Sequence, residues 1–249
     1  MRRIANLFLA ALQLLTRLPV SPCKDLAADS LGKAAVFFPL VGLLVGAGGV
    51  VLNHVLSPYL SRNVLVMLVL LYLVLITGGL HEDGLADAAD GFGGGWQKDQ
   101  ILCIMRDSRI GSYGAIAITF SLLARYVCLG GLGMRDFDRF LVAGQVLNRW
   151  TALPLAFFLR SARQENGQGA RVADKISGLS LVLGTAMAAV IVGVALGLRS
   201  VSTVLVVIAV TIMTAIYYWR RLGGVTGDCM GAANQLVEVT VYFTGVVLR

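Results

Sequence analysis

Apolar segments long enough to cross a membrane follow one another through almost the whole chain. A helix needs about 20 apolar residues to span ~30 Å of hydrocarbon, and a helix satisfies its own backbone hydrogen bonds there. Only 14% of the residues are charged, against about 25% in soluble domains, and 57% are hydrophobic. We therefore predict an all-α, polytopic membrane bundle, formed by residues 1–249 as one domain. It has about seven transmembrane helices, near residues 34–56, 63–80, 111–133, 139–159, 179–198, 201–219 and 235–248.

The first apolar run, Ile4–Leu15, is too short for a spanning helix. No small-residue cleavage site of the A-x-A type follows it, which argues against a signal peptide. We predict an N-terminal interfacial or re-entrant helix, and the sequence leaves open whether residues 4–19 cross the bilayer.

The basic residues indicate how the bundle is oriented. If the seven spans alternate, the segments 17–33, 81–110, 160–178 and 220–234 share one side and carry twelve Lys and Arg, against five in the opposite loops and C-terminus. This bias places the first side in the cytoplasm. It also accounts for the net charge of +7 without a nucleic-acid partner.

The segment HEDGLADAADG, residues 81–91, concentrates carboxylates in an otherwise apolar chain. On a helix, Asp83, Asp87 and Asp90 fall on one face, where their charges repel one another. Oxygen ligands favour a hard cation, and Mg²⁺ is the usual choice where phosphate is also present. We predict a Mg²⁺ site here, with His81 as a hydrogen-bond or phosphate contact; a plain solvated loop is the alternative.

The segment IMRDSRIGSYG, residues 104–114, has the composition of a phosphate-binding turn. Arg106 and Arg109 can bind phosphate bidentately, and a Gly-Ser turn with Ser108 ahead of a helix offers backbone N–H groups to an anion. Asp107 is a candidate catalytic base or further metal ligand. The alternative is a salt bridge that holds the loop closed.

Further polar residues lie nearer the C-terminus. In RRLGGVTGD, residues 220–228, Thr226 is a candidate phosphate contact and Asp228 an additional metal ligand, unless the segment is an ordinary turn. Arg125 and Arg149 fall inside predicted spans, so each should face a partner or a polar cavity. Asn148, beside Arg149, favours a substrate-binding cavity. The polar loop 160–178 is either a substrate lid or a simple connector.

Together these motifs resemble the cobalamin synthase family, the adenosylcobinamide-GDP ribazoletransferases. The likeness covers most of the chain: TRLP at 16–19, FFPLVG at 37–42, TGGLHEDGLADAADG at 77–91, MRDSRIGSYG at 105–114, NR at 148–149 and GGVTGD at 223–228. One departure is Glu82, where the family is expected to carry an apolar residue.

The resemblance implies a Mg²⁺-dependent transferase that completes the nucleotide loop of cobalamin. Its substrates would be adenosylcobinamide-GDP and α-ribazole or α-ribazole 5′-phosphate, and GMP would leave. Asp83, Asp87 and Asp90 would hold the metal, Asp83 and Asp107 would be catalytic, and Arg106, Arg109 and Arg149 would neutralise phosphate. A wide corrinoid site would lie in a membrane-surface cleft or between the subunits of a homo-oligomer.

Two other functions remain open from the sequence. A CDP-alcohol phosphotransferase also uses clustered aspartates of DxxDG type on membrane helices, although here Gly91 is followed by FGGG instead of the usual Ala-Arg. A divalent-cation transporter would use the aspartates as a transport site. Transporters place such acids near the bilayer midplane, whereas these lie at a predicted cytoplasmic edge, which favours an enzyme.

Overall fold

The apolar segments of the chain form helices. The computed structural model describes residues 2–20, 30–163 and 176–248, and within them the only extended pairing is an isolated bridge between Ser161 and Val225. The predicted all-α class is confirmed. The helices are α1 (Arg2–Leu15), α2 (Ser30–Ala34), the 3₁₀ turn η1 (Ala35–Phe37), α3 (Phe38–Leu56), α4 (Arg62–Thr77), α5 (Leu80–Gly94), α6 (Lys98–Ile104), α7 (Ser112–Gly131), α8 (Met134–Phe158), α10 (Gly178–Leu196), α11 (Arg199–Leu222) and α12 (Gly227–Val247).

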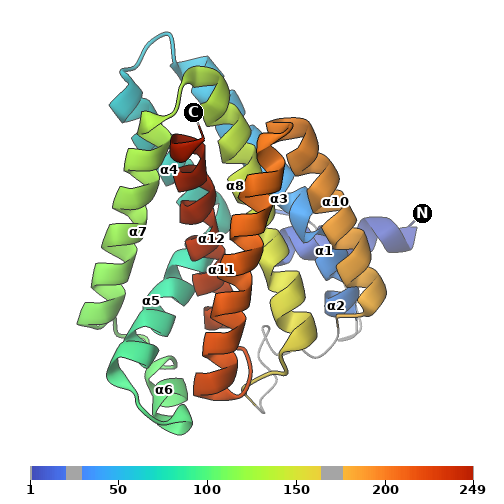
Figure 1. Ribbon diagram of the computed structural model, residues 1–249, viewed down its shortest axis with the longest axis vertical. Helices are drawn as coiled ribbons and strands as arrows, with labels where there is room; N and C mark the ends of the chain where they lie inside the picture. Colours follow the sequence, from blue (N-terminus) through green and yellow to red (C-terminus); the bar gives the residue numbers. More distant parts are fainter. Residues whose placement is uncertain (1, 21–29, 164–175, 249) are drawn as a thin grey trace.

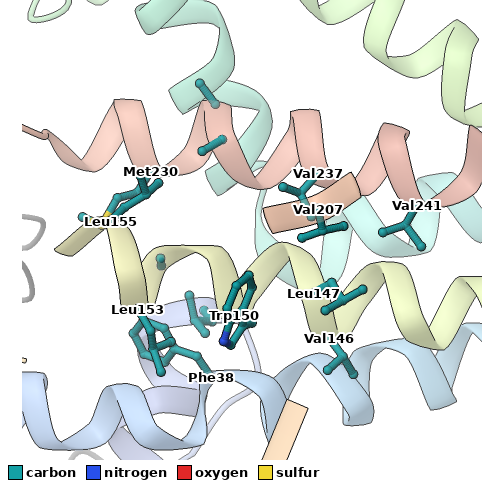
Figure 2. Close-up of a cluster of buried hydrophobic side chains, with 14 of the residues drawn as sticks. Phe38, Val146, Leu147, Trp150, Leu153, Leu155, Val207, Met230, Val237 and Val241 are labelled. Atoms are coloured by element: carbon teal, nitrogen blue, oxygen red, sulfur yellow. The ribbon is translucent and has the colours of Figure 1, made fainter. Parts of the chain in front are cut away.

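Helix α8 is the centre of the bundle (Figure 1). It packs against α3, α10 and α12, while α12 in turn contacts α5, α7 and α11. Figure 2 shows the apolar layer that joins them, with Trp150 and Leu147 of α8 lying between α3 and α12. Sixteen residues of α8 are buried, which is why this helix tolerates polar side chains only where they find partners inside the bundle.

A sharp turn separates α4 from α5. Gly78 and Gly79 both have positive φ, 66° and 71°, a left-handed conformation that costs glycine little. The two helix axes meet at 85°. The turn therefore ends the apolar helix and redirects the chain, so that the aspartate-bearing helix α5 runs across the end of the bundle.

Four described helical segments are long and apolar enough to cross a membrane: Gly32–Leu56, Ser112–Gly131, Gly178–Leu196 and Arg199–Leu222. The bent pair α4–α5 would make a fifth. A multi-pass membrane protein is therefore confirmed, but the number seven is not. The two missing helices are α8 and α12, which meet the length requirement but carry charged residues such as Arg149 and Glu238 in their buried faces.

The connections between helices separate into two groups (Figure 1). Helix α6, the C-terminal end of α8 and the start of α12 lie at one end of the bundle. The α3–α4, α7–α8 and α10–α11 connections and the C-terminus lie at the opposite end. This is the alternation that the charge distribution predicted, and it gathers the polar motifs at one end.

Helix α1 is 14 residues long, too short to cross a bilayer upright. It packs on α2, η1 and α3, with Ala11 and Leu12 buried and Ile4 exposed. A short helix lying against the bundle agrees with the predicted N-terminal helix. Its position at the membrane interface stays a prediction.

Candidate active site

Helix α5 presents three aspartates at helical spacing. Asp83, Asp87 and Asp90 lie at positions i, i+4 and i+7, so they share one face as the sequence predicted. Asp83 is exposed, and Asp87 and Asp90 are half-buried. Ala88, on the other side of the helix, is buried in the bundle.

Helix α12 brings the fourth carboxylate, that of Asp228, to the same place. A Cβ atom on Gly84 would lie 3.1 Å from the backbone oxygen of Asp228 and 3.1 Å from the Cα of Gly231, so α5 and α12 touch backbone to backbone here. The charges of Asp83, Asp228 and Asp90 all act on Asp87. The cluster predicted from two separate motifs is therefore assembled by one close helix crossing.

Thr226 has a defined structural role at this crossing. Its side-chain oxygen accepts a hydrogen bond from the Cys229 backbone N–H at 3.1 Å, which makes it the N-cap of α12. The side chain is buried. The cap fixes the start of α12 and with it Asp228, while a phosphate contact by Thr226 stays a prediction.

Asp90 is bound to the start of α7. Its carboxylate accepts hydrogen bonds from the backbone N–H of Gly111 at 2.7 Å and of Gly114 at 2.9 Å. The free N–H groups that the sequence offered to a phosphate are thus occupied by a carboxylate of the same protein, an arrangement that the positive end of a helix favours. Each Asp90 oxygen keeps a second lone pair, so the predicted metal role is not excluded.

The turn between α6 and α7 holds an ion pair at the surface. Arg109 donates from Nη2 to Asp107 Oδ2 at 2.6 Å and from Nε to Oδ1 at 3.0 Å. These hydrogen bonds lower the pKa of Asp107 to about 2. Arg106 and Ser108, the other predicted phosphate contacts in this turn, are exposed. The geometry therefore matches the predicted salt bridge and leaves Asp107 a weak base.

Three predicted substrate contacts lie inside the bundle instead. His81 is buried, and with the Asn234 amide oxygen turned toward the ring, His81 Nε2 donates to it at 3.2 Å. Asn148 and Arg149 are fully buried in α8. Arg149 Nη1 donates to the side-chain oxygens of Gln145, at 2.7 Å, and of Asn148, at 3.1 Å. In this arrangement they support the site from within.

A buried charge network links α5 to the other helices. Arg125 of α7 pairs with Glu82 at 3.0 Å and with Glu238 of α12 at 3.5 Å. Glu238 also accepts hydrogen bonds from Asn148 Nδ2 and from the Tyr242 hydroxyl. The prediction that Arg125 needs a partner is confirmed. Sequence reasoning missed Glu238, although a lone carboxylate inside an apolar segment was the available signal.

The cluster provides oxygen donors of the kind that a hard cation prefers, but it does not form a complete coordination sphere. Among the described residues, no three His, Cys, Asp or Glu side chains converge closely enough to hold a metal ion. Mg²⁺, however, keeps several waters and is usually bound by one or two carboxylates together with substrate phosphates. The oxygen donors of Asp83, Asp87 and Asp228 fit that requirement, and their mutual repulsion favours a cation between them.

The chain is similar to known proteins over almost its full length. The family described as cobalamin-5-phosphate synthase matches residues 7–246. A Shewanella baltica protein named adenosylcobinamide-GDP ribazoletransferase is 36% identical over 98% of this chain and 94% of its own length. The protein of that name from Shewanella oneidensis is 35% identical over the same shares. No solved structure matches the chain significantly.

Proposed function

The chain belongs to the cobalamin-5-phosphate synthase family, and from this premise we propose that it is a Mg²⁺-dependent ribazoletransferase. Its substrates are adenosylcobinamide-GDP and α-ribazole or α-ribazole 5′-phosphate. The products are adenosylcobalamin, or its 5′-phosphate, and GMP. The observation that carries the proposal is the close crossing of α5 and α12 at Gly84 and Asp228, which brings Asp87 within reach of the charges of Asp83 and Asp228.

In the proposed reaction, the ribazole 3′-hydroxyl attacks the phosphorus attached to the cobinamide arm. A new P–O bond forms, the P–O–P bond breaks, and GMP leaves. Asp83, the exposed carboxylate at the start of α5, accepts the hydroxyl proton. Asp87 and Asp228 hold the cation, which when bound neutralises diphosphate charge. We assign Asp107 the role of orienting Arg109, because a carboxyl with a pKa of about 2 is a poor proton acceptor.

We propose that this chemistry takes place at the cytoplasmic face of the inner membrane. Helix α6 and the α11–α12 connection, which belong to segments that carry the larger share of Lys and Arg, lie at one end of the bundle (Figure 1). Nucleotide substrates are charged and need an aqueous approach, which that end provides. The same position argues against a cation transporter, whose acids would lie near the bilayer midplane.

The deciding experiment follows GMP release by the purified protein in liposomes, with adenosylcobinamide-GDP and α-ribazole 5′-phosphate as substrates. We expect GMP and a matching corrinoid product with Mg²⁺, and neither after chelation. Asp83→Asn should lower turnover by at least about 100-fold, the lower end of the range for losing a general base.

The matched control is Asp99→Asn, which changes an exposed carboxylate on the neighbouring α6. It should turn over like wild type. Turnover that survives chelation would contradict the metal dependence. Equal activity of the two variants would remove Asp83 from the reaction.

A further inference from the structure

One arginine is bonded directly to the carboxylate cluster, and it is not among the arginines that the sequence motifs suggested. Arg163 Nη2 donates to Asp228 Oδ2 at 2.8 Å. The charge of Arg163 also acts on Asp87. This guanidinium therefore lies where substrate phosphate would meet the aspartates of the proposed site.

The backbone around Arg163 is fixed to the GGVTGD segment. Ala162 donates its N–H to the Val225 carbonyl at 2.9 Å, and Val225 donates back to the Arg160 carbonyl at 2.9 Å. These two hydrogen bonds form the isolated bridge between Ser161 and Val225. The same segment, through Thr226, also fixes the start of α12. Arg163 and Asp228 are therefore positioned by one local structure.

The guanidinium of Arg163 is only partly used. Its Nη2 is bonded to Asp228, but among the residues that the structure describes the buried Nε has no hydrogen-bond partner. Leaving a buried charged donor unpaired costs free energy. A planar guanidinium offers Nε–H and Nη–H side by side, the fork that matches two oxygens of a phosphate.

The other arginines of the predicted site are engaged elsewhere. Arg109 donates both Nε and Nη2 to Asp107 and is 87% exposed. Arg149 is fully buried inside the bundle: its Nη1 is bonded within α8, and its Nε and Nη2 have no hydrogen-bond partner among the described residues. Arg163 has the position that phosphate recognition beside Asp87 and Asp228 requires.

We propose that Arg163 binds a phosphate group of the nucleotide substrate, an inference that rests on the proposed function. Without substrate, its guanidinium neutralises part of the charge of Asp228. When substrate binds, a phosphate oxygen replaces Asp228 as the partner of Nη2, and Nε gains the partner that it lacks; the Asp228 carboxylate would then be available to hold the cation. Arg163 thus serves as a counter-ion in one state and a phosphate ligand in the other.

The test measures GDP binding to the full-length protein in detergent, with Mg²⁺, by calorimetry. Arg163→Gln should weaken GDP binding by about 10- to 100-fold, the range for losing a charge-assisted hydrogen bond. Arg163→Lys should lie between wild type and Gln, since lysine keeps the charge and loses the fork. Arg160→Gln, an exposed side chain three residues earlier, is the control and should bind like wild type.

A purely structural counter-ion gives a different result. In that case Arg163→Gln would leave GDP binding unchanged at saturating Mg²⁺, and this outcome overturns the proposal. Equal weakening by Arg160→Gln, or absence of GDP binding in the wild type, also overturns it. The GMP-release assay separates the two proposals. If Arg163→Gln alone loses GDP binding, but the wild-type protein releases no GMP from the two substrates, only the proposed ribazole reaction is rejected.

Discussion

At the scale of single residues, the site contains carboxylates with different roles. Asp83 is exposed, Asp90 is bound to two backbone N–H groups, and Asp107 is paired with an arginine. From the motifs alone, Asp83 and Asp90 are candidate metal ligands, and Asp83 and Asp107 are both candidate catalytic residues. Hydrogen-bond partners, which depend on the fold, distinguish them and decide which one is able to accept a proton.

Replacing Asp107 tests this distinction. The hydrogen bonds from Arg109 lower the pKa of Asp107 to about 2, below the ordinary value of roughly 3.9. Because the folded-state pKa is depressed, the stabilisation by the pair is complete above pH ~4 and is lost as the pH falls through about 2. Asp107 therefore stays ionised at every working pH, and it should not shape the pH–rate profile.

We expect Asp107→Asn to lower kcat by less than about 10-fold and to leave the shape of the pH–rate profile unchanged between about pH 5 and pH 9. The measurement is the rate of GMP release across that range, with Asp83→Asn as the comparison for the loss of turnover. A changed profile together with a drop of more than about 100-fold would return the base role to Asp107.

At the scale of helices, the sequence predicted which residues share a helix face better than it predicted which helices contact one another. Helical spacing placed Asp83, Asp87 and Asp90 on one face, and an arginine inside a span predicted a partner for Arg125. Neither pattern could identify Glu238, because that contact joins residues 113 positions apart in the sequence. The role of Arg163 was missed for the same reason, since it depends on the pairing of two loops.

The sequence predicted spans at 139–159 and 235–248, but α8 and α12 are not among the helices that length and hydropathy select. Hydropathy counts each charged residue against a span, whereas Arg149 and Glu238 are buried against other helices. Helices α8 and α12 therefore combine transmembrane length with a buried polar network. The α4–α5 turn was likewise hidden, since a Gly-Gly pair also occurs in flexible loops.

The crossing of α5 and α12 makes a prediction about Gly84. In Gly84→Ala, the new Cβ would meet the Asp228 backbone oxygen and the Gly231 Cα, both at 3.1 Å. The helices must move apart, at a cost of roughly 1–3 kcal/mol for overpacking. Because the same contact positions Asp228 against Asp87, GMP release should fall more than thermal stability does.

Gly193→Ala in α10 is the matched control, because its Cβ would meet nothing within 4 Å. It should keep or slightly raise Tm, since alanine is the better helix former. Both variants are compared by thermal unfolding in detergent and by GMP release. Wild-type activity in Gly84→Ala would mean that the carboxylates need no close helix crossing.

At the scale of the whole molecule, the buried charge network that joins the helices is separate from the proposed aspartate site. The network around Arg125 and Glu238 ties α5, α7, α8 and α12 together inside the bundle, where an unpaired charge would be costly. The start of α12, whose first turn carries Asp228, lies with α6 at one end of the bundle (Figure 1). A nucleotide could reach that end from water while a membrane-associated partner approaches along the bilayer.

The orientation of the bundle is tested by labelling two cysteines at opposite ends. Lys98 begins α6 at the end that holds the aspartates, and Tyr59 is 80% exposed in the α3–α4 connection at the other end. Cys23 and Cys103 are first replaced by serine. The remaining Cys128 and Cys229 are buried and should stay unlabelled.

In intact spheroplasts, an impermeant maleimide should label Tyr59→Cys and leave Lys98→Cys unlabelled until the membrane is permeabilised. The physical reason is the excess of Lys and Arg in the loops around α6, which are retained in the cytoplasm during insertion. The reverse pattern would place the aspartates outside, away from cytoplasmic nucleotides. A GDP-linked substrate is expected in the cytoplasm, where nucleotides are made. That result would therefore contradict both the orientation and the proposed reaction.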